Sequence, residues 1–280
     1  MPLVRFYKYC NFTIASEICM PEGFICSDTP DVWIRQQAFD ADFGSLGVRG
    51  MRFHALPETL YYSVDGVARY LVRNGNEVLI DPAAGTDEDS IRTFLLTTVL
   101  ASLLLQRNFL VLNGGVANID GEGVAFLGDS CVGKSTLMAA LHQKGVPVFS
   151  DEFCAVTLDE QGSAMAWQGY PTISIWDDSL RNLGWNPDHL RTLRPSIHKF
   201  TLPINSKPMQ PIPLTRLVEL RVTNQPLSWS CLNQKEALTM LLKHSYRQRF
   251  LRGMGLTNLN FQLTSALSKQ ALFRRVNRPW

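Results

Sequence analysis

The stretch that decides the fold is Gly128-Asp-Ser-Cys-Val-Gly-Lys-Ser135, and we call residues 128–133 the glycine-rich loop. The stretch fits G-x-x-x-x-G-K-[ST], the Walker A pattern of phosphate-binding loops. Glycine lets the backbone curl so that successive N–H groups point at one anion. In such a loop Lys134 reaches the β- and γ-phosphates, and the Ser135 hydroxyl ligates Mg²⁺. The expected nucleotide-binding segment comprises Gly128, Asp129, Ser130, Cys131, Val132, Gly133, Lys134, Ser135 and Thr136.

The segments that flank the glycine-rich loop support this interpretation. Residues 123–127 read as a short buried strand, and residues 136–144 as a helix with Gly145 as its C-cap. The helix would direct the positive end of its dipole at the phosphates. Strands at 146–150 and 153–158 continue the alternation, which predicts an α/β core. The alternative to phosphate binding is a structural glycine-rich turn.

A pair of acids, Asp151 and Glu152, follows the strand expected at residues 146–150. One helix and one return strand separate the pair from Ser135, so the carboxylates should come back beside the loop. Ligands in open α/β sheets bind at the carboxyl ends of strands. With Ser135, one carboxylate could hold Mg²⁺, and the other could accept a proton from an attacking hydroxyl. A solvated acidic pair at a strand end is the alternative.

Phosphoryl transfer also needs positive charge close to the transferring group. The candidates are Arg191, Arg194, His198 and Lys199. They lie in or beside residues 193–213, a segment rich in proline and basic residues that we expect to be a loop. Lys199 is the preferred donor, and a solvated basic loop is the alternative.

The N-terminal part of the chain carries strand signals. The period-two spacing of apolar residues predicts a strand at residues 6–14. Strands at 60–64 and 67–72 flank Asp65-Gly66, a strong hairpin signal, and Asn74-Gly75 marks a second tight turn. We therefore expect residues 1–88 to form a small antiparallel β domain and residues 89–280 to form the catalytic domain.

Two helices are expected beside these strands. A segment that resembles a capping box begins a helix over residues 86–106, and the second helix covers residues 235–252. The apolar run inside the first helix is too short to span a membrane, so we expect a buried helix. Further strands are expected at 109–112, 116–119 and 214–222.

Composition excludes several classes of protein. The net charge of +2 implies no polyanionic partner, and the chain carries no nucleic-acid-binding motif. The six cysteines form no C-x-x-C pair, which argues against zinc and disulfides and favours a reducing cytoplasm. No signal peptide is apparent at the N-terminus. From Lys235 onward the sequence contains nine lysine and arginine residues and one acidic residue, Glu236. This basic stretch is either a solvated face or a surface that binds an acidic substrate tail. A homo-oligomer is compatible with these features.

Residues 109–156 resemble the HPr kinase/phosphorylase superfamily. In that family a strand ending in His-Gly leads through a glycine-punctuated hairpin to G-x-S-x-x-G-K-S, and an Asp-Asp pair follows the loop helix. The matching segments here are Leu112-Asn113-Gly114, Asp120-Gly-Glu-Gly123, Gly128-Asp-Ser-Cys-Val-Gly-Lys-Ser135 and Ser150-Asp151-Glu152. Their order and spacing match the family.

The resemblance implies a P-loop kinase core of α/β fold that uses ATP and Mg²⁺ to phosphorylate a serine hydroxyl. It assigns the general-base role to Asp151 and a supporting, metal-related role to Glu152. It also places Asn113 beside the nucleotide, where the family has a histidine that handles a proton in the reverse, phosphate-removing reaction. A metal-binding glutamate of the family is absent from the region of residues 166–174. These departures put the reverse reaction, and HPr as the substrate, in doubt.

The layout of the whole chain resembles the HPr-kinase-related proteins of peptide-tailoring systems. Those include kinases that phosphorylate the C-terminal serine of lasso-peptide precursors. The resemblance therefore implies a peptide or small-protein substrate with an acceptor serine, and no nucleic acid or membrane as a partner. Two alternatives stay open: a small-molecule kinase with the same core, and a nucleotide-binding regulator without transfer activity.

Overall fold

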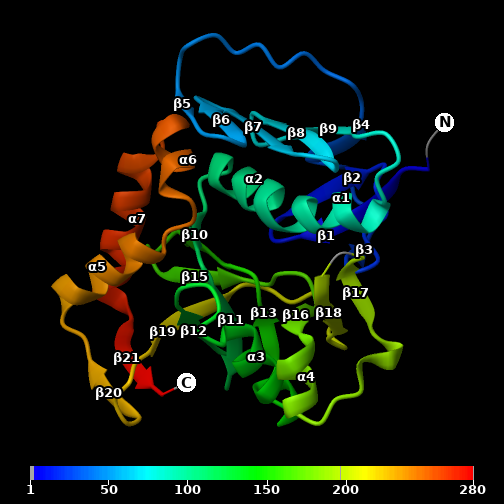
Figure 1. The fold of residues 1–280 in the computed structure, drawn as a ribbon. Coiled ribbons are helices and arrows are strands. Elements are labelled where there is room, and N and C mark those ends of the chain that lie inside the picture. The colour runs from blue at the N-terminus through cyan, green and yellow to red at the C-terminus, as the bar shows by residue number, and fades with distance from the viewer. Residues whose placement is uncertain (1–2, 196, 280) are drawn as a thin grey trace. The chain divides into compact units, whose positions relative to one another are not determined.

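The structure, a computed structural model, describes residues 3–195 and 197–279 and has a mixed α/β fold dominated by sheets (Figure 1). The chain divides into two compact units. The first comprises Met1–Phe109, Leu193–Ile197 and Arg247–Leu259. The second comprises Leu110–Thr192, His198–Tyr246 and Asn260–Trp280. The domain boundary expected between residues 88 and 89 stays a prediction.

The first unit contains a nine-stranded sheet. In hydrogen-bonded order its strands are β3 (Phe24–Ile25), β1 (Arg5–Tyr9), β2 (Phe12–Ser16), β4 (Val32–Gln36), β9 (Glu77–Pro82), β8 (Ala68–Arg73), β7 (Thr59–Val64), β6 (Phe53–Leu56) and β5 (Val48–Arg49). The hairpins at Asp65-Gly66 and Asn74-Gly75 are confirmed by the β7–β8 and β8–β9 ladders.

Two expectations for this unit are corrected. The sheet is mixed, not antiparallel throughout, because β4 runs parallel to both β2 and β9. The strand expected at residues 6–14 is a hairpin, since Cys10 turns the backbone with a φ of 49° and β1 pairs with β2. The period-two spacing of apolar residues continues across the turn, so the sequence pattern does not indicate where the first strand ends.

The expected helix over residues 86–106 is present in the first unit with an interruption. It consists of α1 (Glu88–Phe94), a π-helical turn η1 (Leu95–Val99) and α2 (Leu100–Gln106). Asp87 is the N-cap and accepts from the Ser90 N–H. The apolar run of this helix is buried, as expected. Among the described residues, no helix has the length and apolar character that a membrane crossing requires. A short helix, α6 (Gln248–Gly253), also belongs to this unit.

The second unit contains another sheet with nine strands. Its main path is β10 (Leu110–Leu112), β14 (Cys154–Leu158), β15 (Ala164–Trp167), β19 (Ile212–Val222), β12 (Glu122–Leu127), β11 (Gly114–Ile119) and β13 (Val148–Ser150). A branch leaves β19 through β21 (Leu272–Arg278) to β20 (Ser228–Cys231). Strands β12, β19 and β21 run parallel, and β13 shares their direction because β11 is antiparallel to both β12 and β13. The carboxyl ends of these four strands therefore lie at one edge.

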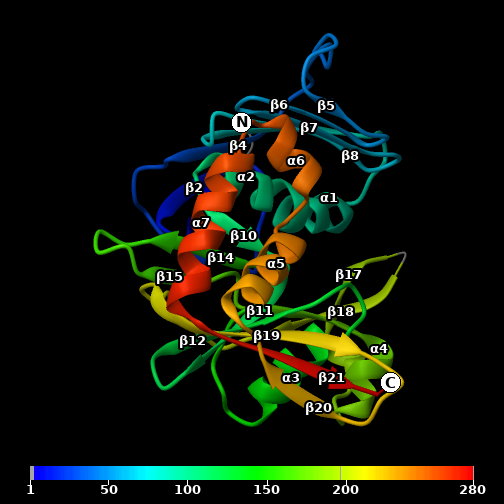
Figure 2. The same ribbon diagram turned by 90° about the vertical axis from the view of Figure 1, so that its left-hand side faces the viewer.

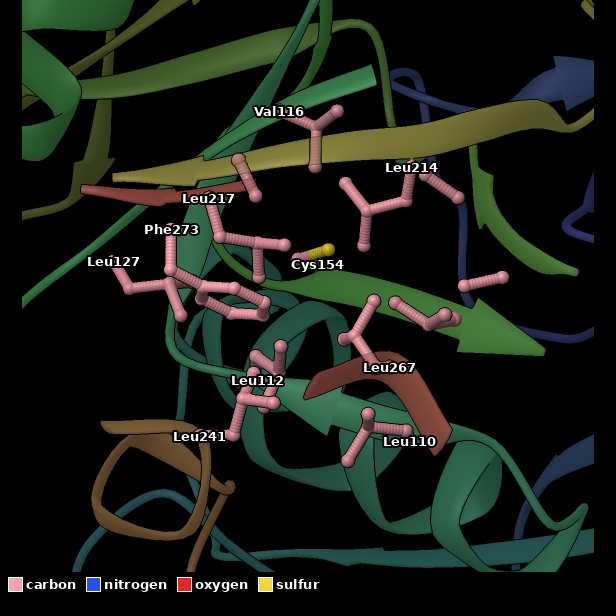
Figure 3. Close-up of a cluster of buried hydrophobic side chains, with 14 of the residues drawn as sticks. Leu110, Leu112, Val116, Leu127, Cys154, Leu214, Leu217, Leu241, Leu267 and Phe273 are labelled. Atoms are coloured by element: carbon pink, nitrogen blue, oxygen red, sulfur yellow. The ribbon is translucent and has the colours of Figure 1, made fainter. Parts of the chain in front are cut away.

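One core of the second unit lies between this sheet and the helices α5 (Gln234–His244) and α7 (Thr257–Gln270) (Figure 3). The parallel strands β12, β19 and β21 contribute Leu127, Leu217 and Phe273 to this core. The helices α5 and α7 contribute Leu241 and Leu267. Burial of these side chains fixes the register of β12, β19 and β21, since a slip of one residue would turn the apolar face outward.

A second core covers the other face beside α3 (Lys134–Gln143). There Met138 and Ala139 of α3 pack with Ile173 and Ile175 of β16 (Thr172–Trp176) and with Leu180 of α4 (Asp177–Asn182). The helix is thus held from its buried face while its first turn remains at the sheet edge. The short 3₁₀ helix η2 (Pro187–His189) follows α4.

Two further expectations are corrected. The segment 193–213 is not a loop throughout: β17 (Arg191–Arg194) reaches into it, and β18 (Ile197–Pro203) pairs antiparallel with β16. The helix expected at residues 235–252 breaks after α5, where Ser245 leaves helical geometry and Arg247 adopts a φ of 46°. Apolar spacing alone did not reveal the break, because both pieces keep buried leucines.

Candidate phosphate-binding site

The glycine-rich loop connects the carboxyl end of β12 to the first turn of α3. Cys131 and Gly133 adopt φ values of 66° and 91°, which turn backbone N–H groups toward a common side. A side chain at Gly133 would be strained by this φ, and its Cβ would lie 2.8 Å from an Arg278 guanidinium nitrogen. Asp129, Ser130 and Cys131 are exposed, and Thr136 lies in the first turn of the helix. The arrangement can bind an anion at the N-terminus of α3.

Lys134 points back over the loop. Its Nζ donates to the backbone oxygen of Gly128 at 2.9 Å and to that of Asp129 at 2.8 Å. Burial lowers the pKa of Lys134, and the nearby charges of Asp151 and Glu152 act against this shift. A cation held by two neutral carbonyl oxygens can exchange one of them for a phosphate oxygen, which gives a stronger, charge-assisted bond.

Asp151 lies directly after β13, at the same edge of the sheet as the loop, and is 4% exposed. Its Oδ2 accepts the Ser174 N–H at 2.9 Å, whereas its Oδ1 has no hydrogen-bond partner among the described residues. Burial raises the pKa of Asp151 to about 7, with a further contribution from Glu152. The Ser174 N–H, the charge of Lys199 and the Ser135 hydroxyl oppose that rise. A buried oxygen without a partner is unusual in a folded protein and fits a site for a ligand.

Glu152 and Lys199 form an ion pair beside Asp151. Their charged atoms are 3.8 Å apart, and Glu152 is the more exposed of the two. Lys199 is held on β18 opposite Trp176 of β16. Asp151 and Glu152 therefore occupy different environments, one buried and one half-exposed, and of the predicted charge donors Lys199 lies near them.

The other predicted donors and Asn113 belong to different elements. The Arg194 guanidinium stacks 5.5 Å from the Phe94 ring in the first unit, Arg191 begins β17, and His198 is exposed on β18. Asn113 precedes Gly114, the register partner of Leu127, so its backbone continues toward the start of the loop. The Asn113 N–H donates to the backbone oxygen of His244 at 2.8 Å.

Sequence reasoning missed Arg278. Its Nη2 donates to the backbone oxygen of Val132 at 2.7 Å, so the end of β21 holds the glycine-rich loop. Residues 272–278 form β21, but no local pattern in their sequence indicates that this strand pairs with β19. The parallel pairing that carries Arg278 to the loop is a long-range feature.

The residues fit a magnesium ion that is shared with a nucleotide. Among the described residues no three His, Cys, Asp or Glu side chains gather to hold a metal. Mg²⁺ in nucleotide sites commonly takes one or two protein ligands, with phosphates and waters completing the shell. The Ser135 hydroxyl and the unpartnered Asp151 Oδ1 match this donor set, and Glu152 lies next to them.

Comparisons with known proteins give distant structural likenesses. No protein-family model matches the chain. No curated protein matches it either. A solved structure described as the HPr(Ser) kinase/phosphatase from Coxiella burnetii is similar over 61% of this chain and 85% of its own, with 11% sequence identity and a TM-score of 0.31.

Proposed function

We propose that this protein is an ATP-dependent kinase that transfers the γ-phosphate to a serine hydroxyl of a peptide or small protein. The observation that carries the proposal is Asp151. It is a buried carboxylate at the end of β13, with one unpartnered oxygen, beside Ser135 and the glycine-rich loop. A phosphate-binding loop and a base at one sheet edge are what in-line phosphoryl transfer to a hydroxyl requires.

The chain's own groups have separate roles in this mechanism. The backbone N–H groups of the loop and the N-terminus of α3 bind the β- and γ-phosphates, and Lys134 moves from its carbonyl partners to the phosphate oxygens. Asp151 orients the serine hydroxyl and accepts its proton at a carboxylate oxygen. Bound Mg²⁺, held by Ser135 with Asp151 or Glu152, would neutralise charge on the phosphates.

Lys199 supplies positive charge on the acceptor side. The Glu152 carboxylate holds its ammonium group, which in turn lies close enough to favour the ionised form of Asp151. In the mechanism this cation stabilises the negative charge that spreads over the transferring phosphoryl group. Asn113 lies near the nucleotide and carries no titratable group, so the reaction runs toward phosphorylation only.

The acceptor we propose is the C-terminal serine of a lasso-peptide precursor, which rests on the layout of the sequence alone. All six cysteines are free, which supports a reducing cytoplasm as the place of action. We propose no nucleic acid or membrane as a partner.

The decisive experiment follows label from [γ-³²P]ATP with Mg²⁺ into serine-containing peptides, for the wild-type protein and for Lys134→Ala. We expect transfer by the wild type and none by the variant, because Lys134 bridges the β- and γ-phosphates in this mechanism. Labelling of a small molecule in place of peptides would identify a small-molecule kinase. Nucleotide binding without any transfer would identify a regulator. Near-normal transfer by Lys134→Ala would show that the assignment of the site is wrong.

A further inference from the structure

A carboxylate with no exposed surface, Glu219, lies on β19 in register with the strand that leads into the glycine-rich loop. Its register partners are Leu127 on β12, the residue directly before the loop, and Arg275 on β21. Figure 2 shows β19 and β21 side by side, ending at one edge. Glu219 thus lies on the side of the loop away from β13 and Asp151.

Four basic side chains converge on Glu219. Arg275 Nε lies 2.7 Å, Arg221 Nη2 3.0 Å, His244 Nε2 3.2 Å and Lys243 Nζ 3.9 Å from its oxygens. Burial opposes ionisation of Glu219, but the hydrogen bonds from His244, Arg275 and Arg221 outweigh it and hold its pKa well below the usual range. A buried ionised carboxylate with several charge-assisted hydrogen bonds is a rigid anchor for its partners.

Lys243 joins this anchor to the glycine-rich loop. It lies at the C-terminal end of α5, and its Nζ donates to the Asp129 carboxylate at 2.9 Å. Lys243 therefore touches a loop acid on one side and faces the buried Glu219 on the other. It belongs to the basic stretch after Lys235, which the proposed mechanism does not otherwise use.

Asp129 adds a negative charge to a loop that we expect to bind phosphate. Like charges in one site repel each other, and a nucleotide with bound Mg²⁺ keeps a net negative charge. Asp129 and Lys134 are also linked, because Lys134 donates to the Asp129 backbone oxygen. An uncompensated carboxylate here would weaken binding of every phosphate chain, whatever base it carried.

We propose that Lys243, fixed by Glu219, is a nucleotide-positioning residue that neutralises Asp129 and so gives the loop a net charge that accepts a triphosphate. This inference rests on the proposed function, since it concerns the same loop. The effect acts through charge and requires no contact between Lys243 and the nucleotide.

If the proposal is right, the affinity for Mg-ATP depends on the net charge of the Lys243–Asp129 pair. Lys243→Gln leaves Asp129 uncompensated, and we expect the Kd for Mg-ATP to rise about tenfold, a change of about 1.4 kcal/mol. Asp129→Asn should tighten binding several-fold, because Lys243 then adds a positive charge. The double variant Asp129→Asn/Lys243→Gln is neutral again and should bind within about threefold of the wild type.

Two matched controls separate charge from structure. Lys235→Gln removes an exposed lysine from the other end of α5 and should leave the Kd unchanged. The pair is partly exposed, at 44% for Lys243 and 66% for Asp129, so salt should screen the effect. The penalty of Lys243→Gln should therefore shrink as KCl is raised to 0.5 M. Tm values of all variants check that the fold is intact.

Isothermal titration with Mg-ATP and with Mg-tripolyphosphate measures these constants. A Kd for Lys243→Gln equal to that of Lys235→Gln would overturn the proposal and leave the pair as a structural contact. A double variant as weak as Lys243→Gln would also overturn it, because Lys243 would then act on the phosphates directly. Failure of the wild type to bind either ligand would contradict the proposed function itself, which is a distinct outcome.

Discussion

The Asp151 carboxylate accepts the backbone N–H of Ser174 at 2.9 Å, which ties the end of β13 to β16. This bond fixes the orientation of the carboxylate and engages Oδ2, while Oδ1 has no hydrogen-bond partner within residues 3–195 and 197–279. Because Ser174 donates from the backbone, no substitution of its side chain other than proline removes the donor. The geometry of the proposed base therefore depends on the β16–β18 ladder more than on any one side chain.

Asp151→Asn should lower turnover strongly. Asparagine keeps the size of the side chain and an oxygen for the Ser174 N–H, but it cannot accept a proton from the serine hydroxyl. We expect kcat to fall by a factor of about 10²–10⁴, with the affinity for ATP unchanged within a few-fold. Steady-state kinetics with the labelled peptide measure both quantities.

Glu152→Gln is the matched control for that substitution. Glu152 is half-exposed and pairs with Lys199, so its loss should show mainly as a higher Mg²⁺ requirement. Normal turnover by Asp151→Asn together with an inactive Glu152→Gln would show that the two roles are reversed.

Asp151→Asn should also change the pH dependence of stability. The pKa of Asp151 is about 7 in the folded protein and about 3.8 in a model compound. Between these values the folded protein keeps a proton that the unfolded chain has released, so the free energy of unfolding falls as the pH rises. Asp151→Asn has no carboxyl group at this position and does not lose stability in this way. The Tm of the variant minus the Tm of the wild type should therefore be larger at pH 8 than at pH 4.

Differential scanning calorimetry at several pH values tests this expectation. A 1 kcal/mol change shifts the Tm of a domain of 150–250 residues by about 2–4 °C, which is measurable. A Tm difference between variant and wild type that stays constant from pH 4 to pH 8 would contradict the raised pKa.

Asn113 should make the enzyme irreversible under ordinary conditions. Its amide cannot take up and release a proton near neutral pH, as a histidine at this position can. Phosphorylated peptide incubated with inorganic phosphate should therefore return no unmodified peptide, as judged by mass spectrometry. Appearance of dephosphorylated peptide with pyrophosphate would refute the prediction.

Arg278→Gln should loosen the glycine-rich loop. The substitution removes the donor to the Val132 backbone oxygen, so β21 no longer holds the loop through this hydrogen bond. We expect nucleotide affinity to fall several-fold while the far-UV circular dichroism spectrum stays the same. Arg274→Gln is the control on the same strand, since Arg274 stacks over Trp229 at 5.0 Å. Equal losses for both variants would indicate a general effect on β21.

The sequence was informative where structure is local. The strand, loop and helix around Gly133 were predicted because tight turns, a lysine-serine pair and an apolar strand are short-range signals. The acids at 151 and 152 were placed at the loop by the length of one helix and one strand. The break after α5 and the strands β17 and β18 were missed, because proline and basic residues are typical of loops and apolar spacing continued across the break.

Long-range pairing explains the remaining omissions. Lys243 and Arg278 reach the loop only because β19 and β21 pair beside β12, and no local pattern specifies that order. The parallel partners of β4 were missed for the same reason. Period-two spacing identifies strands and their faces, but it does not identify their neighbours.

The parallel pairing of β12 with β19 has a consequence for the rate of folding. The Glu122 carboxylate and the Thr215 hydroxyl that bond across this pair are 93 residues apart in the chain, and Arg278 is 146 residues from Val132. Closing such distances costs chain entropy before any contact repays it, so topologies of this kind fold slowly. The loop itself forms from residues that are neighbours in the sequence, but the contacts with β19 and β21 that hold it form late in folding. Competence to bind nucleotide should therefore appear late in refolding, after most secondary structure has formed.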